Sequence, residues 1–231
     1  MGNNMPPIDD ENGVPLQPKR EPMFNAPLSM VLLSGGLVAL YFLYSVQSDQ
    51  VKNGILIDYA LFPERFFAEA GSGYAYDGWI GKALPFIGHG LLHADWAHVL
   101  MNSVFALAFA SGVVRVLGWW RTLLVYAGAQ IGGALLYLYL SQLLPSQASI
   151  AVGASGAVSG LTGAAFLFMA QGHFLSRQFG IYSAVFLVGN VMLALAGPAL
   201  LGSAIAWEAH VGGYIVGALM ALGFSRDVAE S

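Results

Sequence analysis

The stretch from Thr122 to Ser176 contains no Lys, Arg, Asp or Glu, and it is far too apolar for a water-soluble loop. In the whole chain of 231 residues only 10% are charged and 57% are hydrophobic. A soluble domain carries roughly 25% charged residues. Several further apolar runs reach about 20 residues, the length of a helix that crosses a bilayer. These features predict an all-α, polytopic membrane protein.

The apolar runs predict a bundle of six transmembrane helices. The expected ranges are 28–46, 95–114, 122–141, 155–170, 181–199 and 208–224. Six spans place both termini on one side of the membrane. The basic residues of the termini and of the short loops fall on that side too: Lys19, Arg20, Arg115, Arg121, Arg177 and Arg226. Because such residues favour the cytoplasm, we expect both termini to be cytoplasmic, in the inner (plasma) membrane of a prokaryote.

The chain divides into three parts around this membrane domain. Residues 1–27 are rich in Pro and acidic residues, and we expect a disordered cytoplasmic tail. Residues 28–224 form the membrane domain, whose long first loop, 48–92, is aromatic and interfacial. Residues 225–231 form a short cytoplasmic tail. No internal repeat indicates a transporter built from two inverted halves.

Composition excludes several classes of partner. The net charge of −4 and the lack of a basic cluster argue against nucleic acid, so the lipid bilayer is the expected surrounding. The absence of Cys excludes disulfide and thiolate chemistry. We expect no cofactor, and the sequence carries no indication of oligomeric state or of a physiological substrate.

The segment Gly153-Ala154-Ser155-Gly156 opens the fourth predicted helix. Small residues at this spacing are typical of close helix packing in membranes, and that is one interpretation of the motif. The other is catalytic, because the first amides of a helix have no partner within it and point at an anion beside the serine hydroxyl. We also expect Gly153, Gly156, Gly160, Gly213 and Gly217 to let helices approach closely near Ser155.

Polar residues on three predicted helices, this serine among them, share one depth. Counted from the inner end of each span, His98, Asn102, Ser155 and His210 lie roughly 20–27 Å above the inner surface, in a core about 30 Å thick. Polar groups in hydrocarbon must face each other or water. The common depth therefore predicts a site near the outer surface.

The chemistry of this set is that of nucleophilic catalysis. Ser155 is the candidate nucleophile and His210 the candidate base. His98 and Asn102, one turn apart, can aim donors at one point, as an oxyanion hole requires. A third group that orients the histidine is not obvious, because Glu208 faces elsewhere and Asp95 fits a helix N-cap. We therefore predict a Ser–His dyad.

A metal site built from His93, His98 and His210 is the rival interpretation. The chain has no Cys, and carboxylates near these histidines are few. We therefore expect no metal.

These motifs resemble those of the rhomboid intramembrane serine proteases. His93-Ala-Asp-Trp-Ala-His98-Val-Leu-Met-Asn102 is similar to the family's H-x4-H-x3-N helix, Gly153 to Gly156 to its G-x-S-G motif, and Ala209-His210-Val-Gly-Gly213 to its A-H-x-x-G segment. The resemblance covers about residues 28 to 224 and implies a six-helix protease domain that hydrolyses peptide bonds in or near transmembrane segments of protein substrates. It assigns Ser155 as nucleophile and His210 as base. The oxyanion donors would be His98, Asn102 and the Ser155 amide.

Two departures from the family pattern concern the surroundings of the site. The usual Trp-Arg pair of the first loop is replaced by Leu84-Pro85, so the anchoring of that loop is open. Ser159 stands where many members carry an aromatic residue packed on the catalytic histidine. Its hydroxyl either bonds back to the Ser155 carbonyl or orients His210.

Two other functional classes stay open. A catalytically inactive rhomboid-like protein would bind membrane clients, but such relatives typically lose the serine or the histidine. A channel or transporter would need paired charges or broken helices in the membrane.

Overall fold

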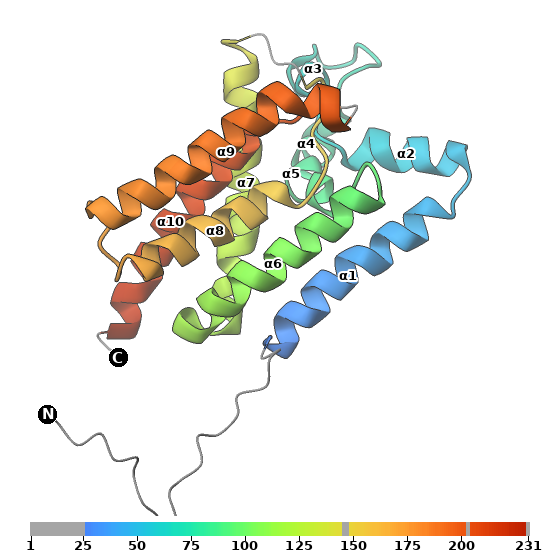
Figure 1. Ribbon diagram of the computed structural model, residues 1–231. Coiled ribbons are helices and arrows are strands. Elements are labelled where there is room, and N and C mark those ends of the chain that lie inside the picture. Colours follow the sequence, from blue (N-terminus) through green and yellow to red (C-terminus); the bar gives the residue numbers. More distant parts are fainter. Residues whose placement is uncertain (1–25, 145–147, 202–203, 230–231) are drawn as a thin grey trace, which may run out of the picture.

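The computed structural model describes residues 26–144, 148–201 and 204–229, and these are almost entirely helical (Figure 1). The long helices are α1 (Leu28–Ser45), α6 (Trp96–Leu117), α7 (Trp119–Ser141), α8 (Ser155–Met169), α9 (Arg177–Leu201) and α10 (Trp207–Ala229). The short ones are α2 (Asp49–Tyr59), α3 (Pro63–Phe67), α4 (Gly78–Ala83), α5 (Pro85–Gly88) and the 3-10 turn η1 (His89–Leu91). The prediction of an all-α, multi-pass membrane protein is confirmed.

Helix lengths separate the clear membrane spans from the shorter core helix. Among the described residues α1, α6, α7 and the Arg177–Gly197 part of α9 are long and apolar enough to cross a bilayer. Helix α8 has 15 residues, about 22 Å of rise, which is less than the thickness of the hydrocarbon core. The count of six spans therefore stays a prediction. A helix this short begins below one surface if it ends at the other.

The two predicted tails differ in whether the structure describes them. Residues 1–25 lie outside the described residues. The cytoplasmic tail predicted from residue 225 onward stays a prediction, and α10 continues into it as far as Ala229. No Pro or Gly follows Gly223 to end the helix, so it extends past the apolar segment.

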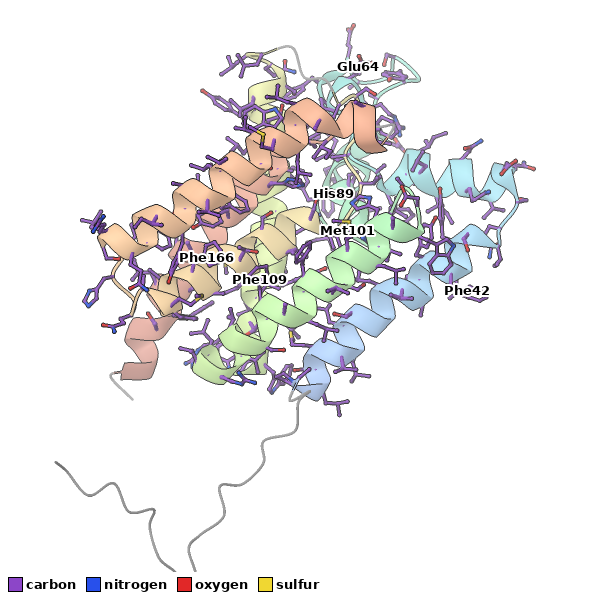
Figure 2. The ribbon with its side chains drawn as sticks, viewed as in Figure 1. Phe42, Glu64, His89, Met101, Phe109 and Phe166 are labelled. Carbon is purple, nitrogen blue, oxygen red and sulfur yellow. The ribbon has the colours of Figure 1, made fainter. Side chains whose placement is uncertain are left out.

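Helix α8 is the centre of the bundle, packed against α10, α7 and α6. Figure 1 shows α1 beside α6 at one edge, and the short helices α2 to α5 gathered at the end of the bundle where α8 begins. The rings of Phe109 on α6 and Phe166 on α8, labelled in Figure 2, meet edge to face with their centroids 6.0 Å apart. Apolar packing of this kind fills the part of the bundle away from the start of α8.

Backbone contact between α8 and α10 is possible only because glycines face each other. A Cβ added to Gly213 would lie 2.0 Å from the carbonyl oxygen of Gly156, and one added to Gly217 would lie 2.3 Å from the Cα of Gly160. Helices in a membrane have no hydrophobic force that drives them together, so packing at this distance has to hold them.

Substitution of Gly213 by Ala should separate the two helices. Its Cβ would meet backbone, which cannot rotate away, so we expect a loss of about 1–3 kcal/mol or more in the free energy of unfolding. Gly223→Ala, on the same helix with no atom within 4 Å of its added Cβ, is the matched control and should be neutral or slightly stabilising. Unfolding in mixed detergent micelles measures both, and equal stability of the two variants would contradict the packing argument.

The first loop is anchored without the Trp-Arg pair. Leu61 pairs with Ala151 through two backbone hydrogen bonds, Leu61 N to Ala151 O at 3.1 Å and Ala151 N to Leu61 O at 2.9 Å. The Tyr76 hydroxyl donates to the carbonyl of Ala60 and accepts from the amide of Phe62. The guanidinium of Arg65 lies 4.4 Å from the centre of the Tyr76 ring. The loop is thus tied directly to the residues that precede α8.

Candidate active site

Ser155 and His210 meet at the end of the α8–α10 contact where both helices begin. Ser155 is the first residue of α8, and His210 lies in the first turn of α10. The hydroxyl oxygen of Ser155 is 2.8 Å from Nε2 of His210, and both residues are half-buried. Gly156 and Gly213, which touch each other, follow them by one and three residues. The backbone contact therefore holds the two side chains within hydrogen-bond distance.

A third residue, Asn190 of α9, completes the contacts of the His210 ring. Its Oδ1 is 2.8 Å from Nδ1 of His210, and its Nδ2 donates to the carbonyl of Trp207 at 3.1 Å. The sequence analysis found no third group. A lone asparagine in a long helix with no charged residue after Arg177 was the available signal, because a buried amide in hydrocarbon needs a partner.

His98 and Asn102 of α6 converge on the turn before Ser155. A Cβ built on Gly153 would lie 2.6 Å from Nε2 of His98 and 3.6 Å from Nδ2 of Asn102. Asn102 is buried, and its Nδ2 has no hydrogen-bond partner among the described residues. An unpaired buried donor that points into a site is costly unless something bound there accepts from it. The predicted N-cap role of Asp95 is confirmed, since its Oδ1 accepts from the amide of His98 at 2.8 Å.

Gly153 does not serve the close packing of helix against helix that the sequence predicted. It lies before α8 rather than between helices, with a φ of +114°, in a region that residues with a side chain rarely adopt. Its missing side chain leaves room for the His98 ring.

Gly153→Ala should therefore damage the site more than the fold. The new methyl group would push His98 away and strain the backbone. If His98 is the oxyanion donor predicted from the sequence, we expect a loss of about 10² or more in the rate of peptide hydrolysis. Gly172→Ala is the control: its φ is +74°, but no atom lies within 4 Å of its added Cβ. Cleavage rates of equally folded variants decide the matter, and equal loss in both would mean that backbone strain alone is responsible.

Gln130 of α7 holds the turn that carries Ser155. Its Oε1 accepts from the amide of Ala157 at 2.9 Å, so it caps a helix whose own N-cap residue is an alanine. Its Nε2 donates to the carbonyl of Gly153 at 3.1 Å and to Nε2 of His89 at 2.7 Å. Sequence reasoning missed this glutamine as well as Asn190, because nothing in the local sequence indicates the partner of a single amide in an apolar helix.

His89, labelled in Figure 2 near the start of α8, fixes the other end of this network. Its Nδ1 donates to the carbonyl of Pro85 at 2.5 Å, and its own carbonyl accepts from the amide of Gly153 at 2.7 Å. The ring must be neutral, because Nε2 has to accept from the Gln130 amide. Burial lowers the pKa of His89 to about 4, from an ordinary value of 6.5.

The pH dependence of stability should show this network. Because the folded pKa lies below the unfolded one, the contribution of His89 is complete above about pH 6.5 and declines as the pH falls toward 4, by up to about 3 kcal/mol. His89→Gln cannot titrate. We expect it to be less stable at pH 7 and to lose less stability between pH 6.5 and 4 than the wild type. Parallel curves of melting temperature against pH for the two proteins would contradict the assignment.

Two other residues considered in the sequence analysis, Ser159 and His93, do not contact the Ser155–His210 pair through any hydrogen bond in the described part of the chain. Both ring nitrogens of His210 have partners other than Ser159, so that buried serine does not orient the ring in this structure. His93 accepts from the amide of Ala154 at 3.4 Å, and its ring lies edge-on to His98. Among the described residues no group of three or more His, Cys, Asp or Glu side chains could hold a metal ion.

The fold and the site define a multi-pass helical membrane protein with a hydrolase-like serine and histidine in contact. Residues 81–227 match the family model described as Rhomboid domain. The chain is 46% identical over 79 residues to the Putative rhomboid protease YdcA of Bacillus subtilis (strain 168), covering 34% of this chain and 37% of that protein. It is 26% identical over 151 residues to the Rhomboid protease AarA of Providencia stuartii, covering 58% of this chain and 53% of that protein.

The matched family model covers well over half of the chain, which therefore belongs to the rhomboid family. The chain spans about half the length, or less, of these two curated relatives. Their names describe proteases.

Proposed function

We propose that this protein is an intramembrane serine endopeptidase, which hydrolyses peptide bonds in or near the transmembrane segments of membrane proteins. The observation that carries the proposal is the 2.8 Å contact between Ser155 Oγ and His210 Nε2 at the start of an apolar helix. A serine and a histidine in this contact form the nucleophile–base pair of acyl transfer.

The reaction proceeds in two halves. His210 Nε2 takes the proton of the Ser155 hydroxyl while Oγ attacks the carbonyl carbon of the substrate. The imidazolium then gives this proton to the leaving amine, and an acyl-enzyme on Ser155 remains. In the second half His210 accepts a proton from water, the resulting hydroxide attacks the acyl group, and the proton returns to Ser155. A carboxylic acid leaves.

The oxyanion formed in each half is stabilised by donors on two helices. His98 and Asn102 converge over Gly153, in the turn that leads to Ser155, and the amide of Ser155 has no acceptor within its own helix. Such fixed donors are worth far more in a site shielded from water than in solvent. The unpaired Nδ2 of Asn102 is the donor with the most to gain.

The site favours a substrate that lies in the bilayer. α1, α6 and α9 carry many large apolar side chains that are exposed on the protein surface, as lipid-facing helices do. A membrane-embedded peptide bond reaches Ser155 only where a helix loosens, because helical amides are internally bonded. The bacterial relatives and the basic residues favour an inner-membrane protein with cytoplasmic termini.

A rhomboid-like protein that binds clients without cleaving them is the second candidate. Such a protein has no need of a serine and a histidine in contact, and this chain has both.

Loss of either member of the pair should abolish cleavage. Ser155→Ala, His210→Ala and the double variant should be equally inactive toward a generic single-span substrate in detergent, because the two side chains act as one unit. Cleavage and gel analysis of purified protein measure this.

A serine-directed phosphonate should label the wild type at Ser155, and a chelator should leave the rate unchanged. Substantial cleavage by either single variant, or inhibition by chelator that zinc reverses, would sink the proposal.

A further inference from the structure

Asn190 is a buried amide on a helix whose other faces are exposed. Only 5% of Asn190 is accessible, whereas its neighbours Val188, Val191 and Met192 are more than half exposed. The side chain is thus the polar point at which α9 reaches the Ser155–His210 pair. Its two hydrogen bonds run to His210 Nδ1 and to the carbonyl of Trp207.

These two bonds determine the proton on the His210 ring. The carbonyl of Trp207 can only accept, so the amide nitrogen of Asn190 must face it. The amide oxygen must then face Nδ1 of His210, and Nδ1 must carry the hydrogen. The neutral ring has one N–H, so Nε2 presents its lone pair to the hydroxyl of Ser155. A single backbone carbonyl therefore selects, through Asn190, the tautomer that a general base needs.

We propose that Asn190 is the positioning residue of His210: it holds the ring in the orientation and tautomer in which Nε2 accepts the proton of Ser155. The catalytic consequence rests on the proposed function, whereas the effect on the tautomer does not. An amide suits this place better than a carboxylate, because a buried negative charge without a cationic partner is expensive.

A merely structural role for Asn190 would be to hold α9 against α10. The chain offers a matched control for that role. Ser183, about two turns away on α9, shares a hydrogen bond of 2.8 Å with the hydroxyl of Tyr214 on α10. Ser183→Ala removes a polar contact between the same two helices without touching the His210 ring.

The test compares Asn190→Leu, Asn190→Asp and Ser183→Ala with the wild type in three measurements. ¹⁵N NMR of histidine-labelled protein, with His210→Ala for assignment, reports the tautomer of His210. The rate of phosphonate labelling reports the reactivity of Ser155. Cleavage of a single-span substrate separates kcat from KM.

In Asn190→Leu we expect a mixture of His210 tautomers, with labelling and kcat reduced roughly tenfold or more and KM little changed. Asn190→Asp should lose less than Asn190→Leu, since a carboxyl oxygen can still accept from Nδ1–H, although its burial is costly. Ser183→Ala should keep the wild-type tautomer and rate. If Asn190→Leu does not fold, Asn190→Ala replaces it in the same measurements.

The wild-type tautomer and labelling rate in Asn190→Leu would overturn the proposal. Equal losses in Asn190→Leu and Ser183→Ala would also overturn it, because helix docking would then explain both. If the wild type itself cleaves nothing, the proposed function fails, and the NMR spectra still decide whether Asn190 sets the tautomer.

Discussion

The backbone contact between α8 and α10 is the constraint on which the rest of the structure depends. Glycines in the middle of a helix cost about 1 kcal/mol each relative to alanine, and α8 and α10 both carry several. The packing of the two helices explains why glycines are present in spite of this cost. Gly156 and Gly213 touch within one turn of Ser155 and His210, so a methyl group there would move the nucleophile away from its base. Helix packing and the candidate catalytic contact are two consequences of the same residues, and the two interpretations of the G-x-S-G motif do not compete.

The turn before α8 is held from outside the helix that it opens. Gln130 reaches it from α7, His89 reaches it from η1, and the first loop reaches it through the pairing of Leu61 with Ala151. Each of these contacts satisfies a backbone group that would otherwise be buried without a partner, as the non-helical backbone of a membrane protein requires. The first loop is therefore part of the support of the Ser155 turn. Its absent Trp-Arg pair is replaced by backbone pairing together with the Arg65–Tyr76 contact.

The sequence predicts well what depends on periodicity and local spacing, and poorly what depends on a single distant partner. Helix positions follow from runs of apolar residues, and Ser155 and His210 stand in motifs whose neighbours are informative. Asn190 and Gln130 are isolated amides within apolar stretches of their helices. Such residues must find a partner, but nothing local indicates which one. The pairing of Leu61 with Ala151 joins two loops far apart in the chain, and only the folded bundle brings them together. Gly153 shows the same limit, since its φ and the His98 ring above it belong to the tertiary structure.

If Asn190 has the proposed role, the orientation of His210 depends on whether α9 is packed against α10. The two properties then change together. Most side chains of α9 are exposed, and its polar links to α10 within the described residues include Asn190 to His210 and Ser183 to Tyr214. A helix held in this way separates from its neighbours more readily than α8, which is enclosed by three others. When α9 is undocked, His210 loses the acceptor at Nδ1, and either ring nitrogen can then carry the hydrogen. The base is therefore correctly set only while α9 is in place. Among the described helices long and apolar enough to cross a bilayer, α9 is the least buried. Placing the orienting residue there thus makes the reactivity of Ser155 depend on the closed bundle.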